Sequence, residues 1–264
     1  MPTGITPPHR PRLDSVRVVL RSRRLVRRLI LALAAACLPG ITVASAAGAD
    51  AGIPNRVPKT QELALLLTTH SAHRAPEAES RQVSLLAARR PITGEQTTVP
   101  VVGHATGKGG IQWLDVMLPG RPDGSTGWIA QNGTRKLFTG WRIIVDLAAR
   151  RVSVYSDGRT ARTFQAVVGK PSTPTPTGQF FVEETVQMEP GAAGGPFALA
   201  LSARSNVLQE FEGGPGQIGI HGRDELGGTL GTAASHGCIR LATASIDWLA
   251  DRVGPGTPVT IYGG

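Results

Sequence analysis

The chain has 264 residues with 33 Gly, 20 Pro and 5% aromatic side chains, a composition that favours short strands and many turns over long helices. Its formal net charge is +9. Residues 1–46 contribute +7 (eight Arg, one Asp), which leaves +2 for residues 47–264 (20 basic, 18 acidic). The clustered basic face that nucleic-acid binding needs is therefore missing from the body of the protein, and we exclude that function.

An export signal is predicted at the N-terminus. An apolar run over 29–43 ends at Ala44-Ser45-Ala46, which has the small-x-small pattern of a cleavage site. The run is shorter than the ~20 residues that a membrane-spanning helix needs. We therefore predict a cleaved signal peptide over 1–46 and an exported protein, with a retained membrane anchor as the alternative. Five of the eight arginines of this region form a cluster directly before the run: Arg21, Arg23, Arg24, Arg27 and Arg28.

The chain has two cysteines, Cys37 and Cys238. Cys37 lies inside the predicted signal, where lipidation is an alternative to cleavage. After cleavage Cys238 would be the lone cysteine, so an internal disulfide is excluded. Its thiol is then either buried and inert, paired with a cysteine of another chain, or used as a free, reactive thiol.

Residues 47–94 are predicted to be a tether with one short helix over 60–69, because no sustained apolar pattern surrounds that stretch. Short strands are then expected at 97–102, 111–117 and 127–130. These strands and their Gly/Pro turns resemble a small SH3-like β domain, which we place at 95–139. Its Trp113 and Trp128 are either core residues or a wall-binding surface.

Residues 140–263 are predicted to form a second, mostly β domain with one packed helix. Asp157-Gly158 is a strong hairpin signal, and a glycine-rich segment over 185–197 that contains Met188 is expected to be a mobile flap near the substrate. The helix is expected over 243–253, with Thr243 as its cap and Gly254-Pro255 as its stop. Strands are expected at 141–147, 151–155, 162–168, 179–184, 197–201, 218–221 and 257–262.

Candidate chemistry concentrates around Cys238. The thiolate is the nucleophilic form of cysteine, and an imidazole within hydrogen-bond reach can take its proton. His236 is two residues before Cys238, which in a strand places the two Cα atoms roughly 6–7 Å apart. His221 ends an apolar strand and can approach from across the fold, and the carbonyl of Gly222 could orient its other ring nitrogen. We predict His221 as the base and His236 as a neighbour that tunes the site or holds the substrate.

Three further residues, Ser235, Gly237 and Arg240, are assigned from their positions. The N–H groups of Gly237 and Cys238 are candidates for an oxyanion hole. Arg240 could clamp a substrate carboxylate, and Ser235 could contact substrate, bond a histidine or shape the turn. A zinc site built from His221, His236 and Cys238 lacks an obvious fourth ligand, so no metal and no cofactor are expected.

The run Ser-His-Gly-Cys-Ile-Arg-Leu at 235–241, preceded by His221, resembles the signature of the L,D-transpeptidase (YkuD-like) catalytic domain. The resemblance includes the segments 175–178 and 219–222 and covers about 141–262, nearly half of the chain. It implies a mostly β, YkuD-like mixed β-sandwich or barrel as the catalytic domain.

The resemblance also implies a reaction. The donor would be a peptidoglycan stem tetrapeptide, commonly with meso-diaminopimelate third, attacked at the carbonyl before its terminal D-Ala. The acyl group would pass to an amine of a second stem, or to water in a carboxypeptidase, and carbapenems would acylate the same thiol. A non-catalytic wall-binding protein is the third possibility. Oligomeric state is not readable from the sequence.

Overall fold

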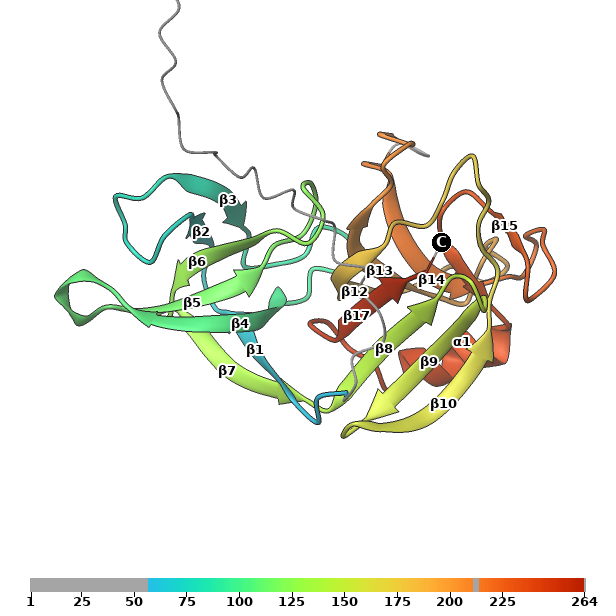
Figure 1. Cartoon of the computed structure of the whole chain (residues 1–264), viewed down its shortest axis with the longest axis horizontal. Coiled ribbons are helices and arrows are strands. Elements are labelled where there is room, and N and C mark those ends of the chain that lie inside the picture. The colour runs from blue at the N-terminus through green and yellow to red at the C-terminus, as the bar shows by residue number, and fades with distance from the viewer. Residues whose placement is uncertain (1–56, 211–213, 264) are drawn as a thin grey trace, which may run out of the picture. The chain divides into compact units, whose positions relative to one another are not determined.

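The computed structural model describes residues 57–210 and 214–263, and nearly all of their regular structure is strand (Figure 1). This confirms the mostly β class. The predicted signal peptide over 1–46, including Cys37, lies outside the described residues. No helix in the described ranges is long and apolar enough to cross a membrane.

The first sheet has seven strands in the order β3-β2-β6-β5-β4-β1-β7, all paired antiparallel. Its buried core includes Leu66, Val99, Val116 and Ile129. A short 3-10 turn, η1 (Lys108–Gly110), connects β4 to β5. The strands are β1 (Gln61–Leu66), β2 (His70–His73), β3 (Gln82–Leu86), β4 (Thr98–Thr106), β5 (Gln112–Met117), β6 (Thr126–Ala130) and β7 (Thr134–Thr139).

The predicted helix over 60–69 is wrong, and the tether prediction fails with it from residue 61 onward. The segment is strand β1, which pairs with β4 on one side and β7 on the other. Residues Leu63, Ala64, Leu65 and Leu66 are all buried. Their good helix propensity is overridden because both edges of the strand gain backbone partners and consecutive residues lie in apolar surroundings on both faces. The likeness to an SH3-like barrel stays a prediction; Trp113 is buried at 4% exposure.

The second sheet has eight strands in the order β10-β9-β8-β17-β12-β13-β14-β16, and a small third sheet pairs β11 with β15. Most pairs are antiparallel, but β17 with β8, β14 with β16 and β11 with β15 are parallel. The strands are β8 (Trp141–Asp146), β9 (Arg151–Ser156), β10 (Arg159–Gln165), β11 (Val168–Gly169), β12 (Gly178–Gln187), β13 (Phe197–Arg204), β14 (Gln217–Gly222), β15 (Ala233–Ser235), β16 (Ile239–Leu241) and β17 (Pro258–Tyr262).

The predicted hairpin at Asp157-Gly158 is confirmed between β9 and β10. Asp157 has φ +52° and Gly158 has φ +77°, the two positive values that a two-residue type I′ turn requires.

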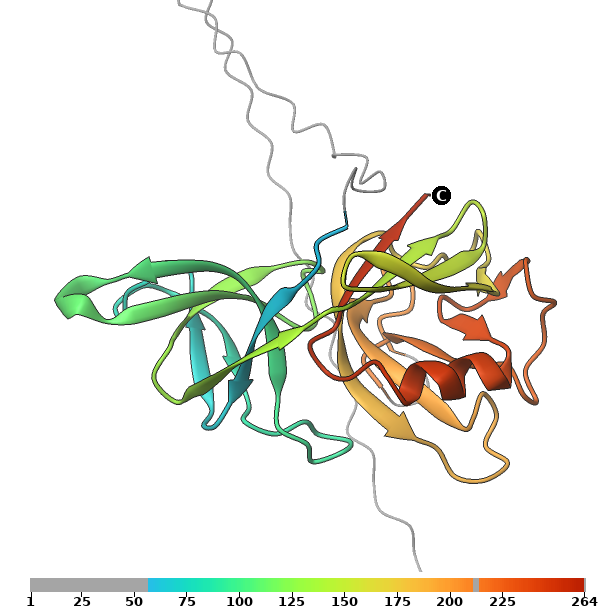
Figure 2. The ribbon, with the colours of Figure 1, turned by 90° about the horizontal axis from the view of Figure 1, so that it is seen from below.

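The predicted helix is confirmed as α1 (Thr243–Ala250), and it buries Ile246 and Leu249. It packs against β13 and β14 (Figure 2). The predicted cap is wrong, because Ala242 occupies the cap position without a side-chain bond. The Thr243 hydroxyl instead donates to Asp224 Oδ1 at 2.5 Å, which joins the start of the helix to the loop after β14.

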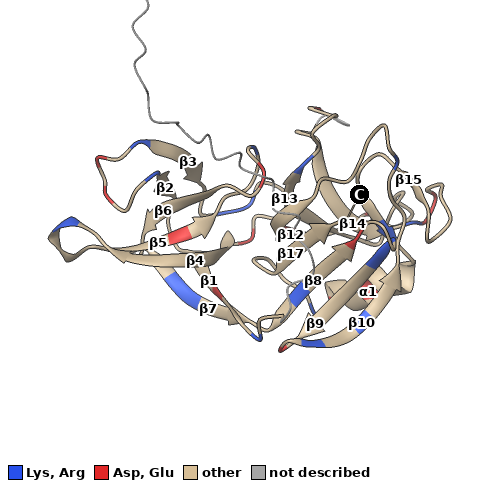
Figure 3. Ribbon diagram, in the orientation of Figure 1, with Lys and Arg blue, Asp and Glu red and all other residues tan. Residues whose placement is uncertain are grey.

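Charged residues of both signs are scattered over both sheets (Figure 3). A buried cluster is the exception: the carboxylates of Glu183 and Glu184 on β12 are each 1% exposed. Arg204 on β13 forms an ion pair with Glu183 at 2.9 Å, and Arg90, from the segment between β3 and β4, pairs with both carboxylates. Burial lowers the pKa of both guanidinium groups.

Candidate active site

The parallel pairing of β14 with β16 brings the predicted cysteine and histidine segments together. Ile220 is the register partner of Ile239, and His221 is the partner of Arg240. Cys238, one residue before β16, therefore lies beside Gly219. The Gly219 N–H donates a hydrogen bond to Cys238 Sγ at 3.4 Å, a contact that favours a negatively charged sulfur over a neutral one.

His221 is oriented by the carbonyl predicted to orient it. Its Nδ1 lies 2.6 Å from the carbonyl oxygen of Gly222. Because a carbonyl oxygen only accepts hydrogen bonds, Nδ1 carries the hydrogen, and in the neutral ring Nε2 keeps a lone pair that can accept a proton.

Imidazole and sulfur converge on Gly219. A Cβ placed on Gly219 would lie 3.9 Å from Cδ2 of His221, and Cδ2 is bonded to Nε2. The ring edge that carries the basic nitrogen thus borders the empty side-chain position of Gly219, whose N–H holds the sulfur. A side chain at 219 would lie beside this ring edge, and glycine leaves that space open.

The hairpin loop between β12 and β13 lies against this histidine. A Cβ on Gly222 would collide with the carbonyl oxygen of Gly195, and one on Gly194 would lie 2.7 Å from His221 Nδ1. The Gly194 N–H also donates to the carbonyl oxygen of Asp224 at 2.8 Å. The predicted flap therefore contacts His221, while its mobility stays a prediction. Met188 closes this loop, and its N–H donates to the Pro196 carbonyl oxygen at 2.8 Å.

Of the roles that the sequence left open for Ser235, the structure shows the shaping of the turn, while its contact with substrate stays a prediction. Its residue is 0% exposed, its hydroxyl donates to the Cys238 carbonyl oxygen at 2.5 Å, and it accepts the Gly237 N–H at 3.1 Å. Both contacts lie within the turn that presents the sulfur, so Ser235 holds the shape of that turn. A hydroxyl of this size satisfies two backbone groups at once, which is why serine serves at tight turns.

The Gly237 N–H is consequently not available as an oxyanion donor, because it is bonded to Ser235 Oγ. Gly237 does require glycine: its φ is +119°, and a Cβ there would lie 3.1 Å from Ile218 Cδ1. Any residue with a side chain would be strained in this backbone conformation before Cys238.

Two threonines that were not predicted as site residues support the same turn. Thr175 Oγ1 donates to the Gly237 carbonyl oxygen at 2.7 Å and accepts the Gly169 N–H at 2.9 Å. Thr173 Oγ1 donates to the Ser235 carbonyl oxygen at 3.2 Å. The alternation of Thr and Pro over 173–177 is the sequence signal, because residues two apart in an extended segment point to the same side.

His236 lies on the exposed side of the turn, where its Nε2 is 3.5 Å from Lys170 Nζ. Arg240 is half-buried, and its Nη1 donates to the Gly227 carbonyl oxygen at 2.6 Å. The substrate roles predicted for Arg240 and Met188 stay predictions. Within the described ranges no group of three or more His, Cys, Asp or Glu side chains is arranged to hold a metal ion.

Comparison with known proteins assigns the region that contains the candidate site to a family. The family model of the L,D-transpeptidase catalytic domain matches residues 140–261. The predicted L,D-transpeptidase YkuD of Bacillus subtilis (strain 168) is 31% identical over 146 residues, which are 55% of this chain and 73% of that protein. L,D-transpeptidase 1 of Mycobacterium tuberculosis (strain ATCC 25618 / H37Rv) is 31% identical over 128 residues, and this chain spans about half of it (49%).

Among solved structures, a mutant L,D-transpeptidase of Enterococcus faecium is 28% identical, with a TM-score of 0.35 over 46% of this chain and 49% of that one. An LD transpeptidase in complex with imipenem is 20% identical, with a TM-score of 0.38 over 61% of this chain and 98% of that one.

Proposed function

Because the chain belongs to the L,D-transpeptidase family, we propose that it cross-links peptidoglycan stem peptides through a thioester on Cys238. The observation that carries the proposal is the convergence on Gly219: its N–H bonds the sulfur, and its missing side chain borders the Nε2 edge of His221. A nucleophile and an oriented base that border the same glycine are the two groups that acyl transfer needs.

In the first half-reaction His221 Nε2 takes the proton of the Cys238 thiol. The thiolate attacks the carbonyl carbon of the third stem residue, and the C–N bond to the terminal D-Ala breaks. His221 returns the proton to the leaving amine, so D-Ala departs and a thioester remains. The Gly222 carbonyl holds Nδ1–H throughout and favours the imidazolium that forms.

In the second half-reaction an amine of another stem attacks the thioester carbon while His221 Nε2 accepts its proton. The C–S bond breaks, an isopeptide or peptide bond forms, and the thiol is restored. Water in place of the amine would give a carboxypeptidase product. The predicted export signal would place this reaction in the cell-wall space.

Arg240 is proposed to contact the donor. Its Nη1 is bound to the Gly227 carbonyl oxygen, which anchors the guanidinium in the loop after β14, and its Nη2 would face a stem carboxylate. We place Met188, on the loop beside His221, at the donor side chain. His236 and Lys170, on the exposed side of the turn, would border the acceptor.

The test is acylation followed by turnover. Wild-type protein should gain the mass of one carbapenem, and Cys238→Ala should gain none, as read by intact-mass spectrometry. With purified tetrapeptide stems, wild-type protein should release D-Ala and yield a dimer; release without dimer would replace the transpeptidase proposal with a carboxypeptidase. Unmodified wild-type protein would contradict the nucleophile assignment.

The base assignment is tested separately by comparing two histidine variants. His221→Ala should slow carbapenem acylation by about 10²-fold or more, the usual contribution of a positioned base, whereas His236→Ala should slow it much less. The reverse order would move the base to His236.

A further inference from the structure

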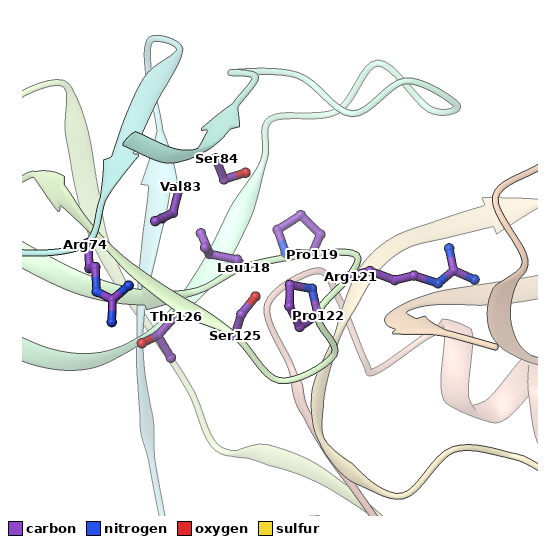
Figure 4. A pocket seen from close by; sticks show the side chains of 9 residues that line it. All are labelled: Arg74, Val83, Ser84, Leu118, Pro119, Arg121, Pro122, Ser125 and Thr126. Atoms are coloured by element: carbon purple, nitrogen blue, oxygen red, sulfur yellow. The ribbon is translucent and has the colours of Figure 1, made fainter. Parts of the chain in front are cut away.

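A pocket of about 350 Å³ opens on the first sheet and shares no residue with the candidate active site (Figure 4). It lies between β3 and the turn that joins β5 to β6. Its lining includes Arg74, directly after β2, then Val83 and Ser84 of β3, and Leu118 and Ser125 of the turn.

The walls of this pocket are fixed by contacts behind them. The turn between β5 and β6 is closed by a hydrogen bond that the Leu118 N–H donates to the Ser125 carbonyl oxygen at 2.9 Å. Beneath the floor, a Cβ on Gly127 would lie 3.1 Å from both Leu118 and Val83, so these two apolar side chains pack directly on the β6 backbone. The pocket is thus a built feature of the sheet.

Arg121 also lines the pocket, but its guanidinium points away from it (Figure 4). It donates to the carbonyl oxygens of Ser205 at 2.7 Å and Pro215 at 3.0 Å. These bonds hold the outer side of the turn, and they leave Arg74 as the cation that can face a ligand.

The lining contains no carboxylate. In the part of the chain that the structure describes, Arg74 is exposed and forms no ion pair or side-chain hydrogen bond, and the hydroxyls of Ser84 and Ser125 have no side-chain bond either. Beside them, Val83 is 43% exposed although it is apolar. A cation and two hydroxyls next to an apolar wall complement a carboxylate that carries a small aliphatic group.

We propose that this pocket binds the C-terminus of a short peptide. The terminal carboxylate would lie on Arg74 with Ser84 and Ser125 as further donors, and a small side chain such as that of alanine would pack on Val83 and Leu118. The volume is near the lower end for ligand sites, ~300 Å³, which suits one or two residues.

The identification of that peptide as a wall stem rests on the proposed function, since stems end in D-Ala with a free carboxylate. A second stem site on the same chain would raise the local concentration of stems around the enzyme. The first sheet would then hold the enzyme on the cell wall through this second stem site.

The test uses the Cys238→Ala protein, which cannot be acylated, and N-acetyl-D-alanyl-D-alanine as probe, with its C-terminal amide for comparison. Binding is followed by NMR shifts of the backbone amides of Val83, Ser84 and Ser125. We expect saturable shifts with the acid and at least tenfold weaker binding of the amide. Arg74→Gln should weaken acid binding at least tenfold, and Ser84→Asp should do the same by repulsion.

The matched control is Arg135→Gln, an exposed arginine on β7 at the far edge of the same sheet, which should bind the probe as the parent does. The proposal would be overturned if the acid and the amide bound equally well, or if Arg135→Gln weakened binding of the acid as much as Arg74→Gln does. It would also be overturned if the probe caused no shifts at these backbone amides. Arg74→Gln in the wild-type background should keep carbapenem acylation, so failure of this site and failure of the proposed catalysis give different results.

Discussion

The hydroxyl of Thr175 should carry a large part of the stability of the turn that presents Cys238. The side chain is 4% exposed and bridges the Gly237 carbonyl oxygen (2.7 Å) and the Gly169 N–H (2.9 Å). Thr175→Val keeps the shape and removes the bridge. Each buried backbone group left without a partner costs about 1–3 kcal/mol. Since the Gly169 group is only partly buried, we expect the free energy of unfolding to fall by about 2–4 kcal/mol.

Thermal and urea unfolding measure this loss. For a protein with 150–250 ordered residues, ~3 kcal/mol corresponds to a fall of about 6–12 °C in Tm. Thr177→Val is the matched control: Thr177 is exposed and lies in the same loop, so its removal should change stability by less than ~0.5 kcal/mol. Carbapenem acylation should slow in Thr175→Val alone. Equal stability and equal acylation rates in the two variants would refute the reasoning that this hydroxyl holds the turn.

Two further predictions concern backbone strain and proton binding. Gly237→Ala should lower the free energy of unfolding by about 1–3 kcal/mol, because its φ of +119° is strained for alanine. Adding Ile218→Val removes the Cδ1 atom that would lie 3.1 Å from the new Cβ, and it should restore only part of this loss in urea unfolding. Full restoration would show that the steric contact with Ile218, and not the backbone strain, causes the loss. Burial and the hydrogen bond to Asp146 raise the pKa of Tyr262 to about 12. In a Tyr155→Phe background, which leaves one tyrosine, absorbance at ~295 nm should follow that midpoint, and Asp146→Asn should lower it. Because the pKa is raised on folding, the stabilisation is complete below pH ~10 and is lost as pH rises toward 12; a midpoint near 10 would contradict the assignment.

Much of the second sheet was predictable because its strands are bounded by strong turn signals. Asp157-Gly158 is one, and Gly254-Pro255 after the helix is another. The short strands β11, β15 and β16 escaped prediction, since two or three residues carry no alternation of their own and are defined by partners far along the chain. The first sheet was predicted less well, because the Gln-Glu-Leu-Ala-Leu-Leu sequence of β1 has the composition of a helix.

In the candidate site, the sequence predicted which segments lie together but left the role of a hydroxyl open. Cys238, His221 and Gly222 come together as expected, because the nucleophile and base segments each have strong local signals. Ser235 was open to a contact with substrate, a bond to a histidine or a role in the turn, and it holds the turn. A hydroxyl's partner is decided by the path of the backbone around it, which residue type alone does not reveal.

The pairing of β14 with β16 explains why His221 suits the role of base better than His236. Parallel strands run in the same direction, so the residue before β16 meets the middle of β14, where Gly219 receives the sulfur. His221 follows Gly219 by two residues, on the same face of the strand, and its Nδ1 is fixed by Gly222. His236 has the same spacing from Cys238, but the turn at Gly237, with its φ of +119°, breaks the extended backbone that would place the two side chains on one face. The glycine that lets the chain present the sulfur therefore also turns the neighbouring histidine toward Lys170.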